Sequence, residues 1–426
     1  MARKMKDSGI EWIGEIPEGW SKNKVIRLFD ISGSGTTPKN ITSDFPVVNW
    51  IQSGDITGSF MPTCKNVISA NLLSQYSALK VYPAPFIIIA MYGASVGNAS
   101  ISLIDGCVNQ ACCVLSSPSC NLHYAFYVIK SAQSYLVRKA VGGGQPNISQ
   151  ETIKQLWLPL PPLSTQDIIV RNLDATCSKI DDLLSSVHAS IEEYKKLKQA
   201  VITLAVTKGV RGEREMKDSG VEWIREIPVD WEISRIKYVS IFEPSCDFKK
   251  LTPETIITYS PMECIKNGTF ERRTSLYGNL AHTLTPFQNG DIVMAKVTPC
   301  FENGNIAIMN ELQSGYGLGS SELFVFRPQN INTRYLFYWL QNKLFVHQAC
   351  ATMTGTGGLK RISPSFVKNC NIHYPSAAEQ AQIAAYLDAK CAEIDGLIAK
   401  KEQLVKELES YKKSLIYEVV TGKREV

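Results

Sequence analysis

A sixteen-residue motif occurs twice in this chain of 426 residues, at 5–20 and again at 216–231. Both copies begin Met-Lys-Asp-Ser-Gly, continue with Glu-Trp-Ile and Glu-Ile-Pro, and end in Trp, so that twelve of the sixteen positions are identical. Two unrelated domains do not share a motif of this length at matching places. The chain is therefore predicted to be a tandem duplication.

A more diverged stretch repeats at a constant offset of 214 residues, so that Gln166 aligns with Gln380, Leu173-Asp174 with Leu387-Asp388, and Thr207 with Thr421. Each repeat then consists of a short motif, a variable body, a proline turn and a long segment. The predicted divisions are a motif at 1–20, a first body at 21–160, a long helix at 161–215, a second motif at 216–231, a second body at 232–375 and a second long helix at 376–426.

The two long segments have helical periodicity. From Thr165 to Lys208, and again from Ala377 to about Val420, apolar residues recur mostly three and four positions apart. At 1.5 Å per residue each helix would extend about 60 Å, too far to bury its stripe against one small domain. We therefore predict that the helices pack together as an antiparallel coiled coil. The expected packing residues are Ile180, Leu183, Val187, Ile191, Ile394, Ile398, Leu404 and Leu408.

The bodies contain short apolar runs bounded by turn residues, which favour strands. Phe86–Met91 and Ala111–Leu115 are such runs in the first body, where Ile31–Pro38 is predicted to be a loop. Asp291–Ala295 and Glu322–Phe326 are their counterparts in the second. The predicted fold class is α/β (α+β): two globular mixed domains separated by the coiled coil, with a pseudo-two-fold internal repeat.

Charge is concentrated in the bodies. The net charge of the chain is +5, and residues 21–160 carry ten Lys or Arg against five acids while residues 232–375 carry fourteen against ten. This distribution favours a phosphate backbone as a partner, although many ordinary domains carry a similar charge.

Several classes of site and location lack their sequence signature. The twelve cysteines form no C-x-x-C pair and the five histidines are isolated, so we expect reduced, packed thiols and no zinc. No apolar run is long enough to span a bilayer and no signal peptide precedes the first motif, so a cytoplasmic protein is expected.

Signatures of enzymes that act on nucleic acids are also missing. There is no G-x-x-x-x-G-K-[ST] loop for a nucleotide and no Asn-Pro-Pro-aromatic or Asp-Pro-Pro-aromatic tetrapeptide of the kind that holds a flipped base in amino-methylating enzymes. We therefore expect no catalytic, cofactor or metal site in this chain.

Glycine-rich and polar loops in the bodies are the candidate DNA contacts. The loop at 141–149 occupies the same place in its repeat as the loop at 354–363, and a third polar loop follows the strand that ends at Ala295. Backbone without side chains can approach a phosphate or a groove edge, but a flexible connector or a structural turn explains these loops equally well. The candidate DNA-binding residues are Lys39, Asn40, Arg138, Lys139, Gln145, Asn147, Lys296, Thr298, Asn303, Ser320, Lys360 and Arg361.

Taken together, these motifs resemble the specificity subunits of type I restriction-modification systems over essentially the whole chain. The resemblance rests on Asp-Ser-Gly-[Ile/Val]-Glu-Trp-Ile followed by Ile-Pro-x-x-Trp at 7–20 and 218–231, on the proline turns that lead through Gln166 and Gln380 into the long helices, and on the run from Lys296 to Gly304 with Gly319–Glu322.

The resemblance implies a non-catalytic subunit in which two target-recognition domains each read one half of a split DNA site. It also implies that the helices dock two modification subunits, which use adenosylmethionine to methylate adenine N6, and that restriction subunits using ATP and magnesium join them. A rod of about 60 Å would hold two reading heads about one to one and a half DNA turns apart, at about 34–36 Å per turn. Because the bodies differ in sequence, two unlike half-sites are expected.

Two other functions remain open at this point. One is a self-sufficient DNA methyltransferase or nuclease, and the other is a coiled-coil scaffold without DNA contact. The sequence gives neither the recognised bases nor the length of the gap between the half-sites.

Overall fold

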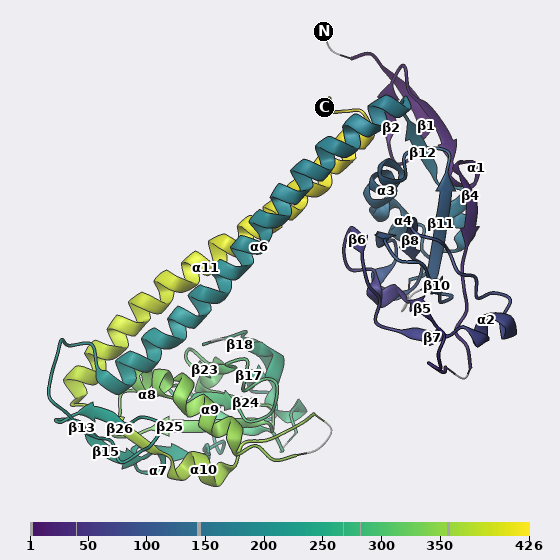
Figure 1. Ribbon diagram of the computed structural model, residues 1–426. Helices are drawn as coiled ribbons and strands as arrows, with labels where there is room; N and C mark the ends of the chain where they lie inside the picture. Colours follow the sequence, from purple (N-terminus) through teal and green to yellow (C-terminus); the bar gives the residue numbers. More distant parts are fainter. Residues whose placement is uncertain (1–2, 40, 143–145, 267, 282, 356–357) are drawn as a thin grey trace. The chain divides into compact units, whose positions relative to one another are not determined.

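A computed structural model describes residues 3–39, 41–142, 146–266, 268–281, 283–355 and 358–426 (Figure 1). The chain divides into two compact units. The first unit comprises residues 1–187 and 404–426, and the second comprises residues 188–403. Each unit therefore takes one half of each long helix.

The two long segments form the helices α6, Leu163–Lys208, and α11, Ala377–Val420, close to the predicted bounds. The Ser376 hydroxyl accepts a hydrogen bond from the Glu379 N–H at 3.4 Å, as an N-cap does. Glycines in the left-handed region, Gly209 with φ +80° and Gly422 with φ +72°, follow the helix ends. Glycine adopts this conformation without a steric clash because it has no Cβ, and the conformation ends a helix.

The helices pair within each unit. In the first unit the end of α11 lies beside the beginning of α6, where Lys412 Nζ pairs with Asp181 at 2.5 Å. In the second unit the end of α6 lies beside the beginning of α11, where Lys198 Nζ pairs with Asp395 at 2.7 Å. The two helices are therefore antiparallel.

The predicted packing stripe is partly wrong. Leu183 is 53% exposed and Leu404 is 41% exposed, whereas their neighbours Leu184 and Val405 turn inward. In each adjacent apolar pair the sequence pattern does not say which member faces the partner helix, because a 3.6-residue period tolerates either choice over one turn. Of the other predicted residues, Ile180, Ile191 and Ile394 are buried, and Val187, Ile398 and Leu408 are half-buried.

The stripe can be tested with two neighbouring substitutions. Ile180→Ala should lower the free energy of unfolding of the first unit by about 2–5 kcal/mol, because it leaves a cavity in the helix seam. The matched variant Leu183→Ala should change it by less than about 0.5 kcal/mol. Hydrogen exchange of first-unit peptides in increasing denaturant measures the free energy of unfolding of both variants. Equal losses of this free energy would mean that Leu183 is packed.

The body of the first unit is built on mixed sheets. Its five-stranded sheet has the order β4-β11-β8-β9-β6, and a three-stranded sheet has the order β10-β5-β7. The bounds of these strands are β4 Phe29–Gly33, β5 Val47–Ile51, β6 Phe60–Met61, β7 Val67–Ser69, β8 Phe86–Ala90, β9 Ala99–Ser102, β10 Cys107–Val108 and β11 Cys112–Pro118.

The second body repeats this topology. Its sheet β16-β25-β22-β23 corresponds to β4-β11-β8-β9, and the parallel pair β17 and β24 corresponds to β5 and β10. The bounds are β16 Ser240–Phe242, β17 Ile256–Ser260, β20 Arg273–Leu276, β21 Thr285–Gln288, β22 Ile292–Ala295, β23 Ile306–Ile308, β24 Tyr316–Gly319 and β25 Leu323–Pro328.

Short helices and strand pairs complete each unit. In the first unit these are β1 Met5–Ile10, β2 Gly14–Pro17, β3 Ser21–Lys24, α1 Val25–Leu28, α2 Asn71–Gln75, α3 Leu122–Ser131, α4 Gln133–Arg138, α5 Gln150–Lys154 and β12 Trp157–Leu160. In the second they are β13 Met216–Asp218, β14 Glu226–Pro228, β15 Glu232–Arg235, α7 Ile236–Val239, β18 Ile265–Lys266, β19 Thr269–Phe270, α8 Thr333–Trp339, α9 Lys343–Ala351, α10 Pro364–Asn369 and β26 Asn371–Tyr374.

The strands predicted around Phe86, Cys112, Ile292 and Phe324 are present. The predicted loop at Ile31–Pro38 is only partly a loop, because β4 continues through Gly33 and pairs with β11. Cysteines lie within these sheets as free thiols, and burial raises the pKa of Cys112 to about 12. Across the described ranges, no helix has the length and apolar character needed to cross a membrane.

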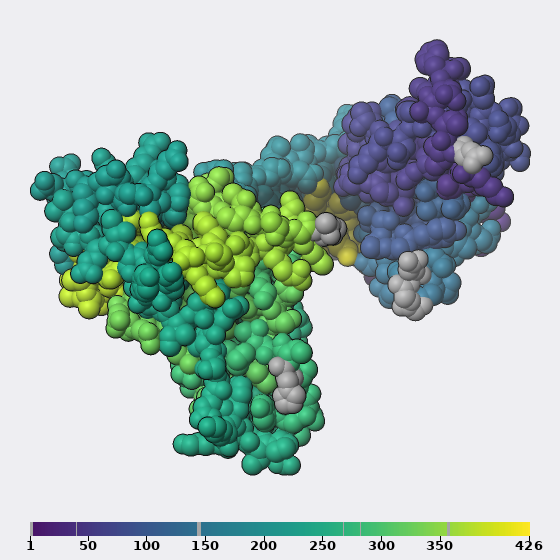
Figure 2. All heavy atoms as spheres, turned by 90° about the horizontal axis from the view of Figure 1, so that it is seen from below, coloured from purple at the N-terminus to yellow at the C-terminus, as the bar shows by residue number. Residues whose placement is uncertain are grey.

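Each long helix end is buried in the core of a unit. Leu415, Val419 and Val420 of α11 belong to the first-unit core, and Ile202 and Val206 of α6 belong to the second-unit core. In the second unit the beginning of α11, yellow-green, also packs against the teal segment around the second motif (Figure 2). The motifs therefore belong to the framework that joins each body to the helices.

Candidate nucleic-acid interface

Three segments of the second body are held together by backbone hydrogen bonds. The Lys296 N–H donates to Glu322 O at 3.0 Å, the Ile362 N–H donates to Lys296 O at 2.9 Å, and the Thr298 N–H donates to Lys360 O at 2.9 Å. We call residues 296–298, 320–322 and 360–362 the second loop frame. The sequence predicted each of its three loops separately, and the structure joins them.

The first body contains the same pattern. The Met91 N–H donates to Ala111 O at 2.8 Å, the Ile148 N–H donates to Met91 O at 2.9 Å, and the Gly93 N–H donates to Pro146 O at 3.0 Å. Residues 91–93, 111 and 146–148 are the first loop frame. By these bonds Met91 corresponds to Lys296, Ala111 to Glu322, and Asn147 to Arg361.

The two frames carry different chemistry on equivalent backbone. In the first frame these positions carry the thioether of Met91, the methyl group of Ala111 and the amide of Asn147. In the second frame they carry the ammonium of Lys296, the carboxylate of Glu322 and the guanidinium of Arg361. Lysine and arginine suit phosphates and guanine edges, whereas an amide suits adenine. Asn147 and Arg361, at equivalent positions, would therefore prefer different bases, whereas Met91 is buried in the first-unit core.

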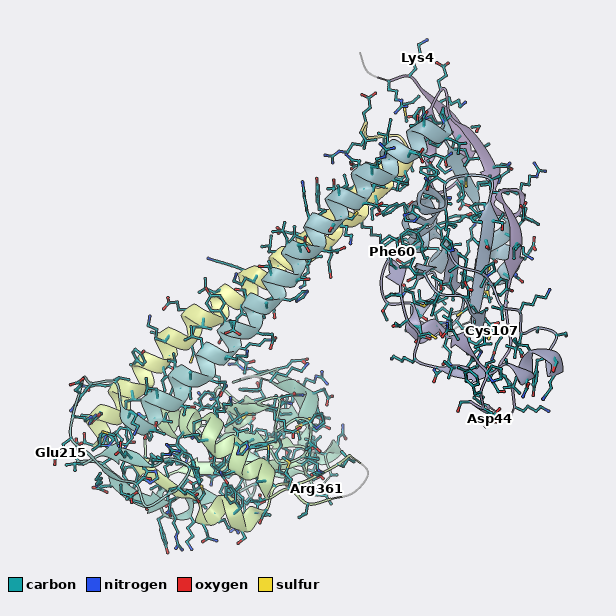
Figure 3. All side chains as sticks on the ribbon, in the orientation of Figure 1. Lys4, Asp44, Phe60, Cys107, Glu215 and Arg361 are labelled. Atoms are coloured by element: carbon teal, nitrogen blue, oxygen red, sulfur yellow. The ribbon has the colours of Figure 1, made fainter. Side chains whose placement is uncertain are left out.

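Within the second loop frame Arg361 pairs with Glu322. Arg361 Nε and Nη2 donate to the two carboxylate oxygens at 2.9 and 2.6 Å, and the guanidinium holds the pKa of Glu322 below its usual value. Arg361 is exposed and lies at the outer edge of the unit, on the other side from Glu215 near the helices (Figure 3). The guanidinium is therefore oriented by a carboxylate and still accessible.

Two predicted contact residues have structural roles in this frame. The Thr298 hydroxyl donates to Gly358 O at 2.8 Å and accepts from the Lys360 N–H at 2.9 Å, which fixes the glycine-rich loop. The Ser320 hydroxyl accepts from the Glu322 N–H at 3.2 Å. By contrast Asn303 is exposed at the tip of the turn after β22, and Lys360 is exposed.

In the first unit Lys39 is exposed on the segment that follows β4. This segment passes close to β10, because a Cβ on Gly35 would lie 1.6 Å from Val108 O. The Thr37 hydroxyl donates to Gln110 Oε1 at 2.6 Å, one residue before Ala111 of the first loop frame. The segment and the frame are thus neighbours.

Arg138 and Lys139 are exposed and lie beside the framework. Lys139 Nζ pairs with Glu11 of the first motif at 3.1 Å, and Arg138 lines a pocket with Trp12 and Tyr417. The basic residues at the end of a helix look like phosphate ligands in sequence, and only the fold shows that the motif lies against them. Asn40 and Gln145, also predicted to contact DNA, fall outside the described residues.

Sequence reasoning missed Tyr92. It follows the buried strand β8, is 45% exposed, and pairs by backbone with Asn147 as Val297 pairs with Arg361. An aromatic ring directly after the apolar run at 86–91 is the available signal in the sequence. In the part of the chain that the structure describes, no group of three or more His, Cys, Asp or Glu side chains could hold a metal ion.

Equivalent side chains tie both bodies to the helices. Tyr124 donates to Val420 O at 3.1 Å and Tyr335 donates to Val206 O at 3.3 Å, while Gln166 and Gln380 accept from the Asn121 and Asn332 N–H groups at 2.9 and 2.8 Å. Tyr127 and Tyr338 likewise donate to Asp174 and Asp388. The framework is thus shared between units whose loop frames differ.

A family model described as the type I restriction modification DNA specificity domain matches this chain twice, at residues 17–193 and 228–407. The Escherichia coli type I restriction enzyme EcoEI specificity subunit is 32% identical over 37% of this chain and 27% of its own length. The EcoAI specificity subunit of the same species is 34% identical with the same shares. The chain thus matches about a quarter of the length of these two relatives.

Other relatives match at greater length. The putative type I restriction enzyme MjaX specificity subunit of Methanocaldococcus jannaschii is 25% identical over 96% of this chain and 95% of its own. A chain from a solved structure of a type I R-M system, described for complex assembly and conformational transition, has a TM-score of 0.71 at 15% identity and covers 95% of this chain and 98% of that one. The likeness to the solved structure supports the fold.

Proposed function

Because this chain belongs to the type I restriction modification DNA specificity family, we propose that it is the DNA-recognition subunit of such a system and that each of its bodies reads one half of a gapped site. The observation that carries this proposal is the pair of loop frames. Equivalent hydrogen bonds hold them, and Lys296, Glu322 and Arg361 in one replace Met91, Ala111 and Asn147 in the other. The half-sites would therefore be unlike each other, and the full site would be asymmetric.

The helices would serve as the platform for partner subunits. Leucines and a tyrosine on α6 and α11 stay exposed although the helices pair, and on each helix they recur seven or fourteen positions apart, which places them on one face of that helix. These residues are Leu183, Leu197, Leu204, Leu404 and Tyr411. In our proposal two modification subunits dock there, and restriction subunits join through them.

Catalysis would belong to the partners. The sequence lacks both a nucleotide-binding loop and the tetrapeptide of amino-methylating enzymes. We propose that adenosylmethionine, ATP and magnesium act in the modification and restriction subunits, and that this chain selects the adenine to be methylated. A preparation of the chain alone that methylated or cut DNA would contradict this division.

The reading head of the second unit can be tested by charge removal. Lys360→Gln should weaken binding of the complex to its DNA and reduce the slope of log K against log salt by about 1, because one phosphate contact is lost. Arg361→Gln should cost about 1–3 kcal/mol of binding free energy at one base pair, because a bidentate base contact is lost.

The matched control is Lys368→Gln, which removes an exposed cation on α10 that lies over the Phe242 ring at 5.1 Å. Fluorescence anisotropy over a range of salt concentrations measures all three variants. If the Lys360 and Arg361 variants bind DNA as tightly as the Lys368 variant and the parent complex, then DNA does not contact the second loop frame.

A further inference from the structure

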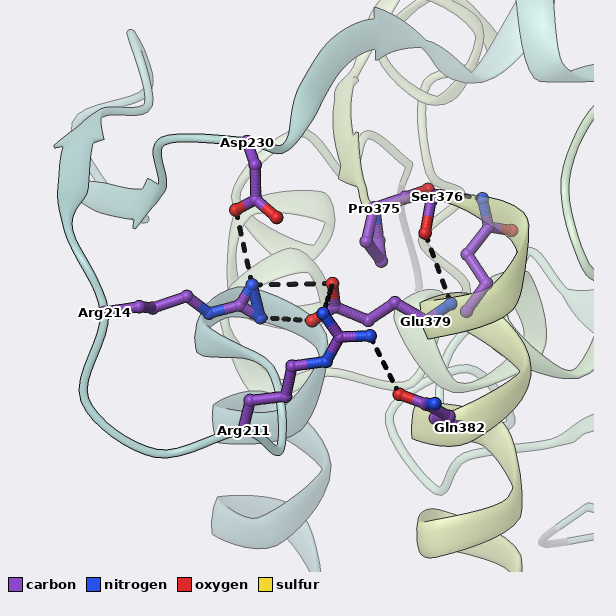
Figure 4. Close-up of polar contacts among 8 residues, drawn as sticks. Arg211, Arg214, Asp230, Pro375, Ser376, Glu379 and Gln382 are labelled. Carbon is purple, nitrogen blue, oxygen red and sulfur yellow. Dashed lines mark hydrogen bonds and ion pairs between the residues drawn. The ribbon is translucent and has the colours of Figure 1, made fainter.

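A carboxylate is buried at the start of α11 in the second unit. Glu379 is 2% exposed, and both terminal nitrogens of Arg214 bond to its carboxylate (Figure 4). Arg214 also pairs with Asp230 at 3.3 Å and lies over the Trp231 ring at 5.8 Å. A buried carboxylate needs such a partner, because removing it from water without one is costly.

The first unit contains the same cradle. The motif offset of 211 aligns Arg3 with Arg214 and Trp20 with Trp231, and the Arg3 guanidinium lies over the Trp20 ring at 5.5 Å. The backbone agrees, since the Glu18 N–H donates to Lys4 O at 3.0 Å where the Val229 N–H donates to Glu215 O at 3.1 Å. The arginine and its aromatic support are therefore present in both units.

The acidic partners are missing from the first cradle. The offset of 214 places Thr165 where Glu379 stands, and Gly19 takes the place of Asp230. A surface pocket lies there, lined by Arg3, Lys4, Pro17, Glu18, Gly19, Trp20, Pro162 and Thr165. Among the described residues no carboxylate lies within ion-pair distance of Arg3, and the exposed Lys4 and Glu18 offset each other in charge.

We propose that this pocket, the Arg3 pocket, binds a carboxylate side chain of a partner polypeptide in the place that Glu379 fills in the second unit. The inference rests on the proposed function, in which the partner is a modification subunit. It makes the two docking positions unequal: the partner at the first unit supplies an anion, and the partner at the second unit meets a site that is already filled.

The surroundings of the pocket favour a polypeptide over a free carboxylate. Leu163 and Ile168, on the same first turns of α6, are 60% and 50% exposed, where the second unit has Ala377 and Gln382. A single guanidinium holds a free carboxylate weakly, whereas a carboxylate on a docked protein is presented at a high effective concentration. Apolar contacts beside the pocket would provide that docking.

The test compares association of the full chain with its modification subunit, without DNA, by titration calorimetry and native mass spectrometry. Arg3→Gln should weaken one of the two binding steps at least about tenfold, the effect of losing a hydrogen bond to a charged group. Arg3→Lys should retain most of the affinity, and Arg27→Gln, at another exposed arginine of the first unit, should leave both steps unchanged.

A second variant fills the pocket from within. Thr165→Glu should weaken the same step and should raise the melting temperature by about 2–4 °C, since it copies Glu379. Thr165→Gln, of equal size without charge, should not raise the melting temperature, and combining Thr165→Glu with Arg3→Gln should abolish the gain.

Unchanged association of the Arg3→Gln chain would overturn the proposal. A second outcome would also overturn it: sodium acetate raises the melting temperature of the parent chain more than sodium chloride does, while Arg3→Gln leaves association with the modification subunit unchanged. That outcome would identify a free carboxylate as the ligand. DNA methylation by the parent complex tests the proposed function separately. The proposal for the Arg3 pocket can therefore fail while the proposed function holds.

Discussion

Arg214→Met should lower the free energy of unfolding of the second unit by about 3–5 kcal/mol, because it leaves the buried Glu379 carboxylate without the cation that hydrogen-bonds to it. The Arg214 side chain is only 16% exposed, so water cannot readily replace it. Arg211 belongs to the same linker but is 53% exposed, and its nitrogen lies 3.7 Å from Glu379. Arg211→Met should therefore cost less than about 1 kcal/mol.

Hydrogen exchange in increasing urea measures both variants, with first-unit peptides as an internal reference. Combining Arg214→Met with Glu379→Met should recover most of the loss, because replacing a whole buried ion pair by apolar side chains is often neutral. Equal losses from Arg214→Met and Arg211→Met would show that the buried pair does not hold the start of α11.

Replacing the first body by a copy of the second should replace the first half-site of the recognised DNA and leave the second half-site unchanged. The joints are equivalent, since the Val25 N–H donates to Leu156 O at 2.9 Å and the Ile236 N–H donates to Cys370 O at 3.1 Å. Residues 236–370 can therefore take the place of residues 25–156 while the strand pairs β3–β12 and β15–β26 remain. The resulting chain would carry two copies of the second loop frame.

The methylated motif of that chain should contain the second half-site twice and should become a palindrome, because two identical bodies on antiparallel helices would read opposite DNA strands. The first half-site of the parent motif should be absent. Sequencing of methylated adenines in a host that carries the chain with its modification subunit measures this. Retention of the first half-site would contradict the assignment of one body to one half-site.

The framework was predictable from sequence because it is repeated. The matched positions at Gln166 and Gln380, or at Val206 and Val420, exist because both units make the same bonds there. Helix periodicity likewise gave α6 and α11 to within a few residues. It could not decide between Leu183 and Leu184, because steps of three and four residues from Ile180 to Val187 can pass through either one, and only Leu184 packs against the core.

The loop frames were harder to predict because their parts are distant in sequence. Lys296, Glu322 and Arg361 lie far apart in the sequence and are joined by backbone bonds and by the Arg361–Glu322 ion pair, whereas the offset of 214 aligns Asn147 with Arg361 in the sequence itself. The charge of Lys139 predicts a phosphate contact, and the sequence does not show that its ion-pair partner Glu11 lies in the first motif. Contacts between a motif and a body have no periodic signature.

In the proposed function this one chain carries two unlike reading heads. Single-molecule methylome sequencing of a host that carries the parent chain with its modification subunit tests it most directly. We predict one adenine-methylated motif in two parts, separated by unspecified bases, with different sequences in the two parts. A continuous motif, a palindromic motif, or methylation that persists when this chain is deleted would contradict the account.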